Sequence, residues 1–332
     1  MERSGTGARH RLGGLIAIIA IAAFSACFAA PAMAATGGAP TPSGSAPPPP
    51  SRSGAPDPAP TAGTLRLLSA KTWPRKSFYY GVRSPRLRYE IDSDMPTNDL
   101  RVDVVDAAGV VVKSFFRNDV APASPDSVRW DGIGRGGKPA PNGRYSFRIV
   151  PQTGGRLARK AFQRSVRALR RSARRAASSA AKQQLSLSFQ LYDYAFPVLG
   201  PHNYGQGGAR FGAGRSGHSH QGHDVMARCG TPLVAARGGR VRYSGFQGAA
   251  GNYVVIDGKG TGYDTAYMHL LRPSPLRAGM TVRTGQPIGV VGSTGSSTAC
   301  HLHFELWTAP GWYEGGSPID PLGLLKRWDR YS

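Results

Sequence analysis

The sequence predicts a mainly β protein, in which a small β-sandwich is followed by a second, antiparallel β domain and a basic linker or helix joins the two. Gly (44 residues) and Pro (27 residues) are abundant in the 332-residue chain, which favours strands and turns over long helices. Short runs of alternating apolar and polar residues recur between turn residues, as in half-buried strands. The length suffices for two ordinary domains, and hydrophobic residues make up 40% of the chain, enough for at least one core.

The N-terminus has the features of an export signal. Arg3, Arg9 and Arg11 precede the apolar run LIAIIAIAAFSACFAA, and the small residues of PAMA follow it. This order predicts a signal peptide over residues 1–34 that is cleaved after Ala34. The alternative is an uncleaved N-terminal anchor, because the apolar run approaches the length of a membrane span. We therefore expect a protein that is secreted or associated with the cell envelope.

The net charge of the chain favours an anionic environment. The formal charge is +23, which suits nucleic acid, a membrane surface or an anionic cell wall. An exported protein does not meet nucleic acid in the cytoplasm, so we expect the anionic partner to be a component of the cell envelope.

Residues 35–62 follow the predicted signal peptide and are rich in Pro, Ala, Gly and Ser, a composition that predicts a disordered linker.

Residues 63–152 predict the β-sandwich. The alternating runs are TLRLLSA, RLRYEI, LRVDVVDAAGVVVKSFF, SVRWDG and GRYSFRIVP. DAAG and PNG between them are turn signals. The stretch VRWDGIGRGGKPAPNGRYSFRIV resembles the Ig-like domain of flagellar hook-capping proteins, with its Trp-Asp-Gly turn and its Asn-Gly-Arg-Tyr entry to the last strand. The resemblance implies a spacer or a binding module, and we expect a spacer because no catalytic residue types cluster there.

The connecting segment, residues 153–188, is strongly basic. Residues 156–182 contain ten basic residues and no acidic one. Its Ala, Arg, Leu and Lys favour a helix. Four apolar residues would form a thin stripe on that helix: Leu157, Phe162, Val166 and Leu169. The segment is either a solvated linker or a cationic surface that adheres to an anionic wall polymer or to lipid headgroups.

Residues 189–328 predict the second β domain. They are dense in Gly, Val and aromatic residues with repeated turns. The predicted strands are 233–236, 240–245, 252–257, 264–270, 280–283, 287–292 and 301–307. We expect a compact, mainly antiparallel domain.

Seven of the eight histidines lie in this second domain, which points to a metal or a catalytic site. CHLHF reads as a strand, and residues i and i+2 of a strand face the same side. His301 and His303 therefore emerge together, while Leu302 faces the opposite side. AYMHL also reads as a strand, and it would bring His269 to the same site.

In HQGHD three residues lie between His220 and Asp224, and glycine and a turn would bring both side chains to one point. Two imidazoles and one carboxylate from separate segments suit Zn²⁺ with a fourth position open for water. The histidines left over would lie near the metal, which suits hydrolysis.

After removal of the signal peptide two cysteines remain, Cys229 and Cys300, and in an oxidising compartment they predict a disulfide. The alternative is two free buried thiols.

Residues 196–325 resemble the M23 (lysostaphin-type) zinc metallopeptidases of bacterial cell walls. HQGHD corresponds to the family's H-x-x-x-D, YMH to its Tyr-x-His and HLH to its H-x-H. CGTPLVAARGGRV, GNYVVID, MTVRTGQPIGVVGSTGSSTACHLHFEL and PIDPLGLL follow in the family's order. The resemblance implies antiparallel sheets around a groove, one Zn²⁺ per chain and hydrolysis of peptidoglycan peptides.

Carried over residue by residue, the resemblance assigns His220, Asp224 and His303 as zinc ligands. It assigns His269 and His301 as the two catalytic histidines. A Cys229–Cys300 bridge would then pin the two ligand-bearing segments to each other.

The remaining polar residues near these motifs keep alternative roles. His218 and His223 flank the first ligand, so the register of the ligands could shift onto either. We expect His202 at the rim of the groove or on the surface. Glu305 shares the strand face of His303, where it either supports a histidine or has a plain surface role.

The predicted reaction is amide hydrolysis in the cross-linking or stem peptides of peptidoglycan, by a monomer. A glycine bridge, a D-Ala–diaminopimelate link and a stem-peptide bond are all open as substrates. The alternative is a non-catalytic or latent wall-binding or regulatory protein that retains the peptidase fold. Latency would arise if residues 156–200 occupied the groove.

Overall fold

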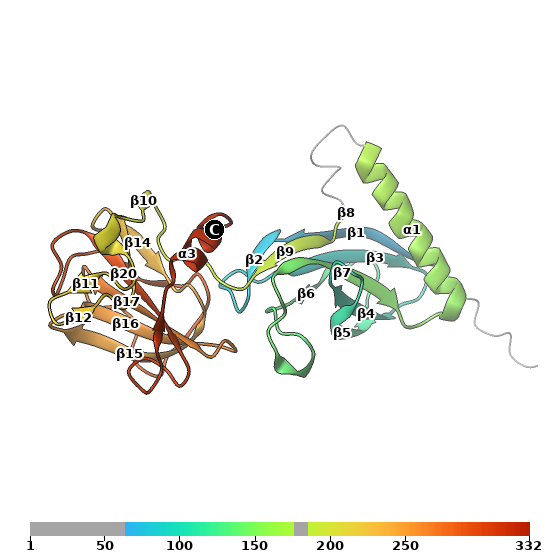
Figure 1. The fold of residues 1–332 in the computed structure, drawn as a ribbon. Coiled ribbons are helices and arrows are strands. Elements are labelled where there is room, and N and C mark those ends of the chain that lie inside the picture. Colours follow the sequence, from blue (N-terminus) through green and yellow to red (C-terminus); the bar gives the residue numbers. More distant parts are fainter. Residues whose placement is uncertain (1–63, 176–184) are drawn as a thin grey trace, which may run out of the picture. The chain divides into compact units, whose positions relative to one another are not determined.

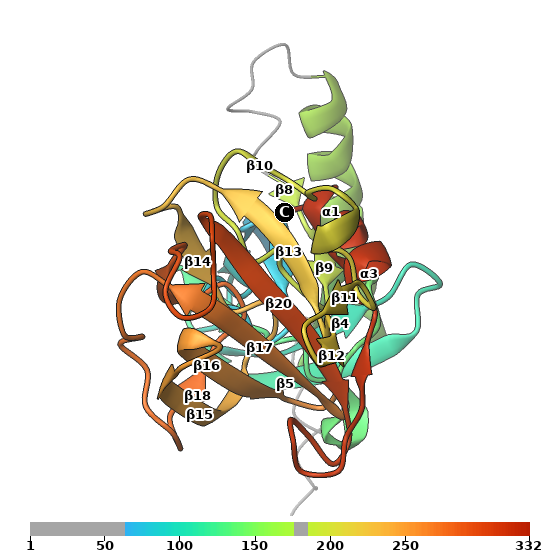
Figure 2. The same cartoon turned by 60° about the vertical axis from the view of Figure 1, so that its left-hand side comes forward.

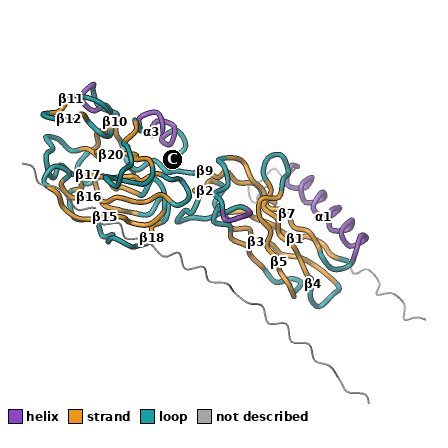
Figure 3. The backbone as a smooth tube through the Cα atoms, turned by 60° about the horizontal axis from the view of Figure 1, so that its bottom comes forward, coloured by secondary structure: helices purple, strands orange, loops and turns teal. Residues whose placement is uncertain are grey.

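The structure is a computed structural model that describes residues 64–175 and 185–332. The predicted signal peptide, the predicted linker 35–62 and residues 176–182 of the basic segment lie outside the described residues. Strands and loops dominate, as Figure 3 shows, so the prediction of a mainly β protein is confirmed. Within the described ranges, no helix is both long and apolar enough to cross a membrane.

The first domain contains two sheets (Figure 1). The four-stranded sheet has the order β6 (Asp126–Arg129), β3 (Arg86–Ser93), β1 (Leu65–Trp73) and β8 (Leu185–Ser186). The five-stranded sheet has the order β2 (Lys76–Phe78), β9 (Ser188–Tyr192), β7 (Gly143–Pro151), β4 (Asn98–Val105) and β5 (Val111–Val120). The helices among the described residues of this domain are the short η1 (Arg135–Gly137) and the long α1 (Gly155–Arg175).

One apolar core serves both sheets of the first domain. Side chains alternate between buried and solvent-facing along β1 and β7, as the period of two requires. Leu67, Tyr89, Val102 and Phe147 belong to the same buried cluster, although they come from both sheets. The predicted two-sheet arrangement is therefore present, while its classification as Ig-like stays a prediction.

The basic segment forms helix α1, one of the two predicted forms, but the helix packs on this domain instead of being fully solvated. Ala158, Phe162 and Val166 are buried, and α1 contacts β1, β7 and β8. The backbone N–H of Leu67 donates to Ser165 Oγ at 3.0 Å. Leu157 is 68% exposed, so it does not share the buried face of the predicted stripe.

The domain boundary also lies later than predicted. Strand β9 pairs with β7 and β2, so the first domain extends to about residue 192 instead of ending at 152. The reason is that β8 and β9 follow α1 in the sequence and return the chain to the two sheets. Such a long-range pairing leaves no local signal in the sequence.

The second domain is built on one large antiparallel sheet (Figure 2). Its order is β10 (His202–Asn203), β13 (His223–Ala227), β20 (His301–Thr308), β17 (Tyr263–Leu270), β16 (Gly251–Gly258), β15 (Gly239–Gln247) and β18 (Thr281–Val282), with β21 (Pro318–Ile319) also on β20. Two small sheets pair β11 (Gly214–Arg215) with β12 (His218–Ser219) and β14 (Pro232–Val234) with β19 (Pro287–Val290). The helices are η2 (Gly207–Ala209) and α3 (Leu322–Asp329).

Strand β20 has the two faces that the sequence predicts. Leu302, Phe304 and Leu306 lie in the main core of the domain, which also contains Trp328 of α3. His301, His303 and Glu305 alternate with them and line a cavity on the other face. Each of the seven predicted strands overlaps an observed one. Strand β13 was not predicted, because only the short apolar run VMA follows the polar stretch HQGHD.

Candidate metal centre

Strand pairing brings two of the predicted ligands together. β13 and β20 are antiparallel, with Asp224 directly opposite His303 and Met226 opposite His301. Side chains of directly opposed residues lie on the same face within contact distance. The register therefore places one carboxylate and two imidazoles on the cavity side of the sheet.

The loop before β13 delivers the third ligand. His220 donates its backbone N–H to the carbonyl of Ala213 at 2.8 Å, and its Nδ1 lies 2.8 Å from the carbonyl of Arg210. Gly222 lets this loop approach β20 closely, because a Cβ there would lie 2.4 Å from the carbonyl oxygen of Phe304 and 2.9 Å from His303 Nε2. Any larger residue at position 222 would push the His220 loop away from the site.

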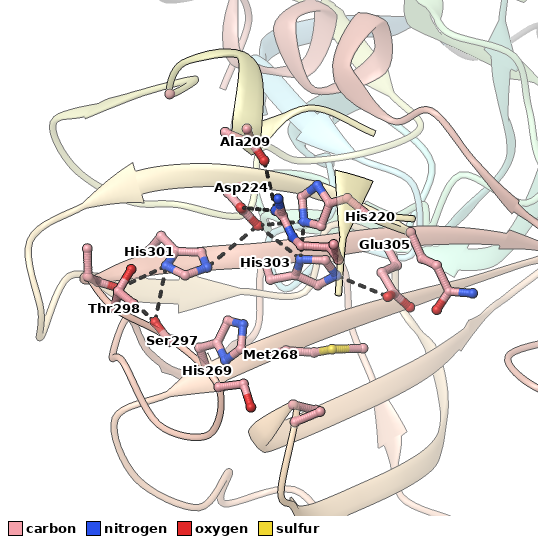
Figure 4. Close-up of a pocket in the computed structure, with 18 of the residues that line it drawn as sticks. Ala209, His220, Asp224, Met268, His269, Ser297, Thr298, His301, His303 and Glu305 are labelled. Atoms are coloured by element: carbon pink, nitrogen blue, oxygen red, sulfur yellow. Dashed lines mark hydrogen bonds and ion pairs between the residues drawn. The ribbon is translucent and has the colours of Figure 1, made fainter. Parts of the chain in front are cut away.

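The three predicted ligands converge in Figure 4. His220 Nε2 lies 3.0 Å from Asp224 Oδ1 and 2.8 Å from His303 Nδ1. His303 Nδ1 lies 2.9 Å from Asp224 Oδ1. One ligand atom from each residue falls within 4.8 Å of the others. His220 and His303 are buried, and Asp224 is 9% exposed.

The hydrogen bonds around this cluster show which of its ring nitrogens carry protons and which are acceptors. A carbonyl only accepts, so His220 Nδ1 carries a proton toward Arg210 and His220 Nε2 faces the cluster as an acceptor. Likewise His303 Nε2 donates to Glu305 Oε1 at 3.0 Å, which leaves His303 Nδ1 facing the cluster. With the Asp224 carboxylate, three acceptors meet at one point. A positive species, either a proton or a metal cation, must therefore lie between them.

The electrostatics of the cluster favour positive charge at the same point. Burial alone would lower the pKa of His303, but hydrogen bonds to Asp224 and Glu305 raise the pKa to about 9. Burial opposes the charged form of Asp224, yet hydrogen bonds from His220 and His303 hold its pKa well below the usual range. The residues present thus fit a divalent cation, and their N₂O ligand set suits Zn²⁺.

Glu305 supports a ligand and has no surface role. It is 3% exposed, and its carboxylate accepts from His303 Nε2, from Trp307 Nε1 at 2.7 Å and from Trp312 Nε1 at 2.8 Å. Burial opposes its charge, but these three donors hold the pKa of Glu305 below its ordinary value. A carboxylate that orients a metal-binding histidine is a common partner of zinc sites.

His269 and His301 lie beside the cluster with matching orientations. His269 Nδ1 is 2.7 Å from the carbonyl of Thr294, and His301 Nδ1 is 2.8 Å from the carbonyl of Ala299. Both Nδ1 atoms therefore carry protons, and each ring is left with Nε2 free to accept. The ring centroids are 4.8 Å apart, and His301 Nε2 lies 3.5 Å from Asp224 Oδ1.

The backbone turns His269 into the cavity. Met268, the residue before His269, lies opposite His303. In a regular strand, the side chain of His269 would therefore point to the other face of the sheet. His269 instead has φ 61°, a conformation that is uncommon outside glycine and recurs at functional sites. Burial lowers the pKa of His269 to about 4, which keeps the ring neutral near pH 7.

These residues line a cavity of about 1040 Å³. Its two acidic side chains, Asp224 and Glu305, are both engaged in the contacts above. Arg215 is the single Lys or Arg among the described residues that line it. Arg215 Nη2 lies 2.8 Å from the carbonyl of Gly208 and 3.5 Å from Asp224 Oδ2. The described part of residues 156–200 contributes nothing to this lining.

The other histidines lie outside the ligand group. His223 is fully buried with Nε2 3.1 Å from the carbonyl of Tyr204, on the face of β13 away from Asp224. His218 lines the cavity but is exposed and lies 3.1 Å from the carbonyl of Ser216 through Nδ1. His202 packs against Phe196 with tilted rings and lies 3.2 Å from Asp329, which ties it to α3.

The predicted disulfide joins Cys229 to Cys300. Cys229 follows β13, and Cys300 precedes β20. The bond therefore links the two strands that carry Asp224 and His303, as expected. The placement of the five site residues agrees with the predicted ligand set and the predicted catalytic pair, whose roles remain predictions.

Comparison with known proteins shows what the second domain is similar to. Residues 218–321 match Peptidase family M23. Peptidoglycan DD-endopeptidase ShyC of Vibrio cholerae is 44% identical over 87 residues, which are 26% of this chain and 20% of that protein. Glycyl-glycine endopeptidase ALE-1 of Staphylococcus capitis is 33% identical over 130 residues, which are 39% of this chain and 35% of that protein.

Among solved structures, the antimicrobial peptidase lysostaphin from Staphylococcus simulans shares 31% identity, covering 38% of this chain and 51% of that chain with a TM-score of 0.33. The chain thus matches well under two thirds of the length of each of these relatives. The family match supports the predicted resemblance to M23 peptidases and lies entirely within the second domain.

Proposed function

We propose that this chain is a secreted, zinc-dependent endopeptidase that hydrolyses amide bonds in peptidoglycan peptides. The match to a peptidase family whose relatives include peptidoglycan endopeptidases supports a peptidoglycan hydrolase. The observation that carries the proposal is the convergence of His220, Asp224 and His303 as three acceptors beside two further histidines, His269 and His301, in one cavity.

His220 Nε2, Asp224 Oδ1 and His303 Nδ1 would hold the metal. When bound by three protein ligands, Zn²⁺ polarises a carbonyl and lowers the pKa of a coordinated water to near 7. Glu305 fixes the tautomer of His303 so that Nδ1 faces the metal. Gly222 and the Cys229–Cys300 bond hold the two ligand-bearing segments against each other.

His269 and His301 supply the proton transfers that amide hydrolysis needs. Their Nδ1 atoms are held by backbone carbonyls, so each Nε2 accepts a proton without a change of tautomer. A neutral imidazole can take a proton from the attacking water and return it to the leaving amine. The protonated ring then also stabilises the negative oxygen of the tetrahedral intermediate.

Arg215 favours a substrate with a free carboxylate close to the bond that is cut. In a D-Ala–diaminopimelate cross-link, the carbon next to the scissile nitrogen carries a carboxylate, whereas a glycine bridge has none. A guanidinium binds a carboxylate through two parallel hydrogen bonds. We therefore propose the direct diaminopimelate cross-link over a glycine bridge, and Arg215 as the residue that recognises it.

The alternative is a non-catalytic or latent wall-binding protein. A degenerate site would lack at least one of the five site residues, and all five are present with acceptor atoms directed into the cavity. Latency through the basic segment would need that segment in the groove, whereas α1 buries Phe162 and Val166 in the first domain. The catalytic function is therefore the better supported of the two.

Digestion of purified peptidoglycan tests the proposal. We expect muropeptide dimers to fall and monomers to rise, with the new ends identified by mass spectrometry. A chelator should stop the reaction and added Zn²⁺ should restore it. Unchanged muropeptides with zinc-loaded protein would instead favour the non-catalytic alternative.

Export is tested separately. N-terminal sequencing of protein recovered from the culture medium or envelope should begin at Ala35 if the signal peptide is cleaved as predicted. A chain that starts at Met1 and remains in the membrane fraction would indicate the uncleaved anchor.

A further inference from the structure

The first domain contains a second cavity, of about 660 Å³, that four arginines line together. Arg170 and Arg174 come from the last turns of α1, Arg75 follows β1, and Arg144 lies at the start of β7. The floor includes apolar groups of β8 and β9, among them Leu185 and Phe189. Segments that are far apart in the sequence thus bring four positive charges to one concave surface.

The fold supplies no counter-charge for these arginines. Glu and Asp are absent from the described residues that line the cavity. None of the four guanidinium groups has a hydrogen bond or an ion pair with another described residue. The sequence between α1 and β8, AASSAAKQQ, also contains no carboxylate. Elsewhere in the same domain, by contrast, Arg101 and Arg148 share Asp103, and Arg117 pairs with Asp126.

Assembling these charges works against folding. Like charges four residues apart on a helix, such as Arg170 and Arg174, repel each other and slightly destabilise it. A polyanion that enters the cavity would remove this repulsion and gain hydrogen bonds from each guanidinium fork. The cavity volume is in the range of ligand sites and exceeds the size of one small oxyanion, so the cavity has room for a ligand with several anionic groups along a chain.

We propose that this cavity, formed by Arg75, Arg144, Arg170 and Arg174, binds a flexible phosphodiester polymer of the cell wall. From the sequence we expect an anionic partner for the basic segment, and the proposal assigns the binding of that partner to a defined site. It does not depend on hydrolytic activity. A flat membrane contacts protruding residues, whereas these arginines line a concavity that a narrow chain can enter. Single-stranded nucleic acid is disfavoured because base stacking needs accessible aromatic rings. Phe189, the one aromatic ring among the described residues that line the cavity, is 3% exposed.

Two matched double variants of the full chain test the site. R170Q/R174Q removes two charges that line the cavity. R171Q/R175Q also removes two positive charges, four residues apart on α1, but neither of these residues lines the cavity. One residue is about 100° of rotation on a helix, so the two pairs face different directions. Thermal unfolding of both variants should match the wild type, because all four side chains are exposed.

The probe is a glycerol phosphate oligomer of defined length, with binding measured by calorimetry at one salt concentration. Loss of two charge-assisted hydrogen-bonding groups should weaken binding at least about tenfold in R170Q/R174Q, against about twofold or less in R171Q/R175Q. Cleavage of a soluble muropeptide dimer should be unchanged in both variants, which separates this site from the proposed peptidase.

Other outcomes would overturn the proposal. Equal weakening in the two variants would mean that general positive charge attracts the polymer without a defined site. Full competition by inorganic phosphate at the same phosphate concentration would indicate a small-anion site. Preferential binding of phosphatidylglycerol vesicles or of oligothymidylate, lost in R170Q/R174Q, would identify a membrane or a nucleic acid as the ligand.

Discussion

Glu305 shows how one buried side chain sets the chemistry of the candidate metal centre. Two indole N–H groups and one imidazole N–H saturate its carboxylate, which fixes the protonated nitrogen of His303 and turns Nδ1 toward Asp224. The sequence indicated only that Glu305 shares the strand face of His303. Trp307 lies two residues beyond Glu305 on the same strand face, whereas Trp312 could not be foreseen, because it reaches the site from a loop beyond β20.

Replacing Glu305 by Gln should weaken zinc binding by about 10- to 100-fold, the usual effect of losing a carboxylate behind a metal-binding histidine. The amide of glutamine would place an N–H group at the position where the carboxylate of Glu305 now accepts hydrogen bonds from Trp307 and Trp312. Competition against a chromogenic chelator measures the affinity. E90Q, which removes a carboxylate on β3 of the first domain, is the control and should bind zinc like the wild type. An E305Q variant with wild-type affinity would show that Glu305 does not position His303.

Arg215 makes a prediction about specificity at the same scale. R215Q should lower kcat/KM at least about tenfold for a cross-link with a free carboxylate next to the scissile amide, since a charged hydrogen bond is lost. The same substrate with that carboxylate amidated should be cleaved equally by both proteins. R210Q, a matched change in the same loop that does not line the cavity, should affect neither substrate. Equal losses on both substrates would contradict carboxylate recognition.

At the scale of elements, the reliable predictions came from local periodicity. The alternation in CHLHF places two histidines on one face of β20, and the structure has this face on the cavity. The position of β13 needed more information, because its five residues follow a glycine-containing turn and gain their strand geometry from pairing with β20. The positive φ of His269 has no sequence signature either, since it depends on the backbone bond from His269 to Ala250.

Helix α1 illustrates the same limit. Its composition predicted a helix, but the burial of Phe162 depends on contacts with a core formed by distant strands. F162A should destabilise the first domain by about 3–5 kcal/mol through loss of a buried ring. L157A, on the exposed side of the same helix, should change the stability by less than about 0.5 kcal/mol. Urea unfolding followed by hydrogen exchange of first-domain peptides reports both values. Equal stabilities would show that α1 does not dock.

At the scale of the whole molecule, charge and chemistry are divided between two domains. The second domain gathers the histidines, the acidic ligand and the disulfide around one cavity. The first domain carries α1, whose nine Arg and Lys residues have no acidic neighbour in the helix. We infer that the net charge of +23 serves attachment to an anionic wall, while hydrolysis depends on the buried centre. Variants that affect one property should leave the other intact.

The most direct test of the central claim is the zinc content of purified protein, measured with its peptidoglycan hydrolysis in the same samples. The wild type should contain about one zinc per chain and release cross-linked muropeptides. H303A should lose both zinc and activity, whereas H218A, which removes an exposed histidine of the same cavity, should keep both. A metal-free H303A variant that still hydrolyses peptidoglycan, or a wild type that is active without metal, would contradict the account.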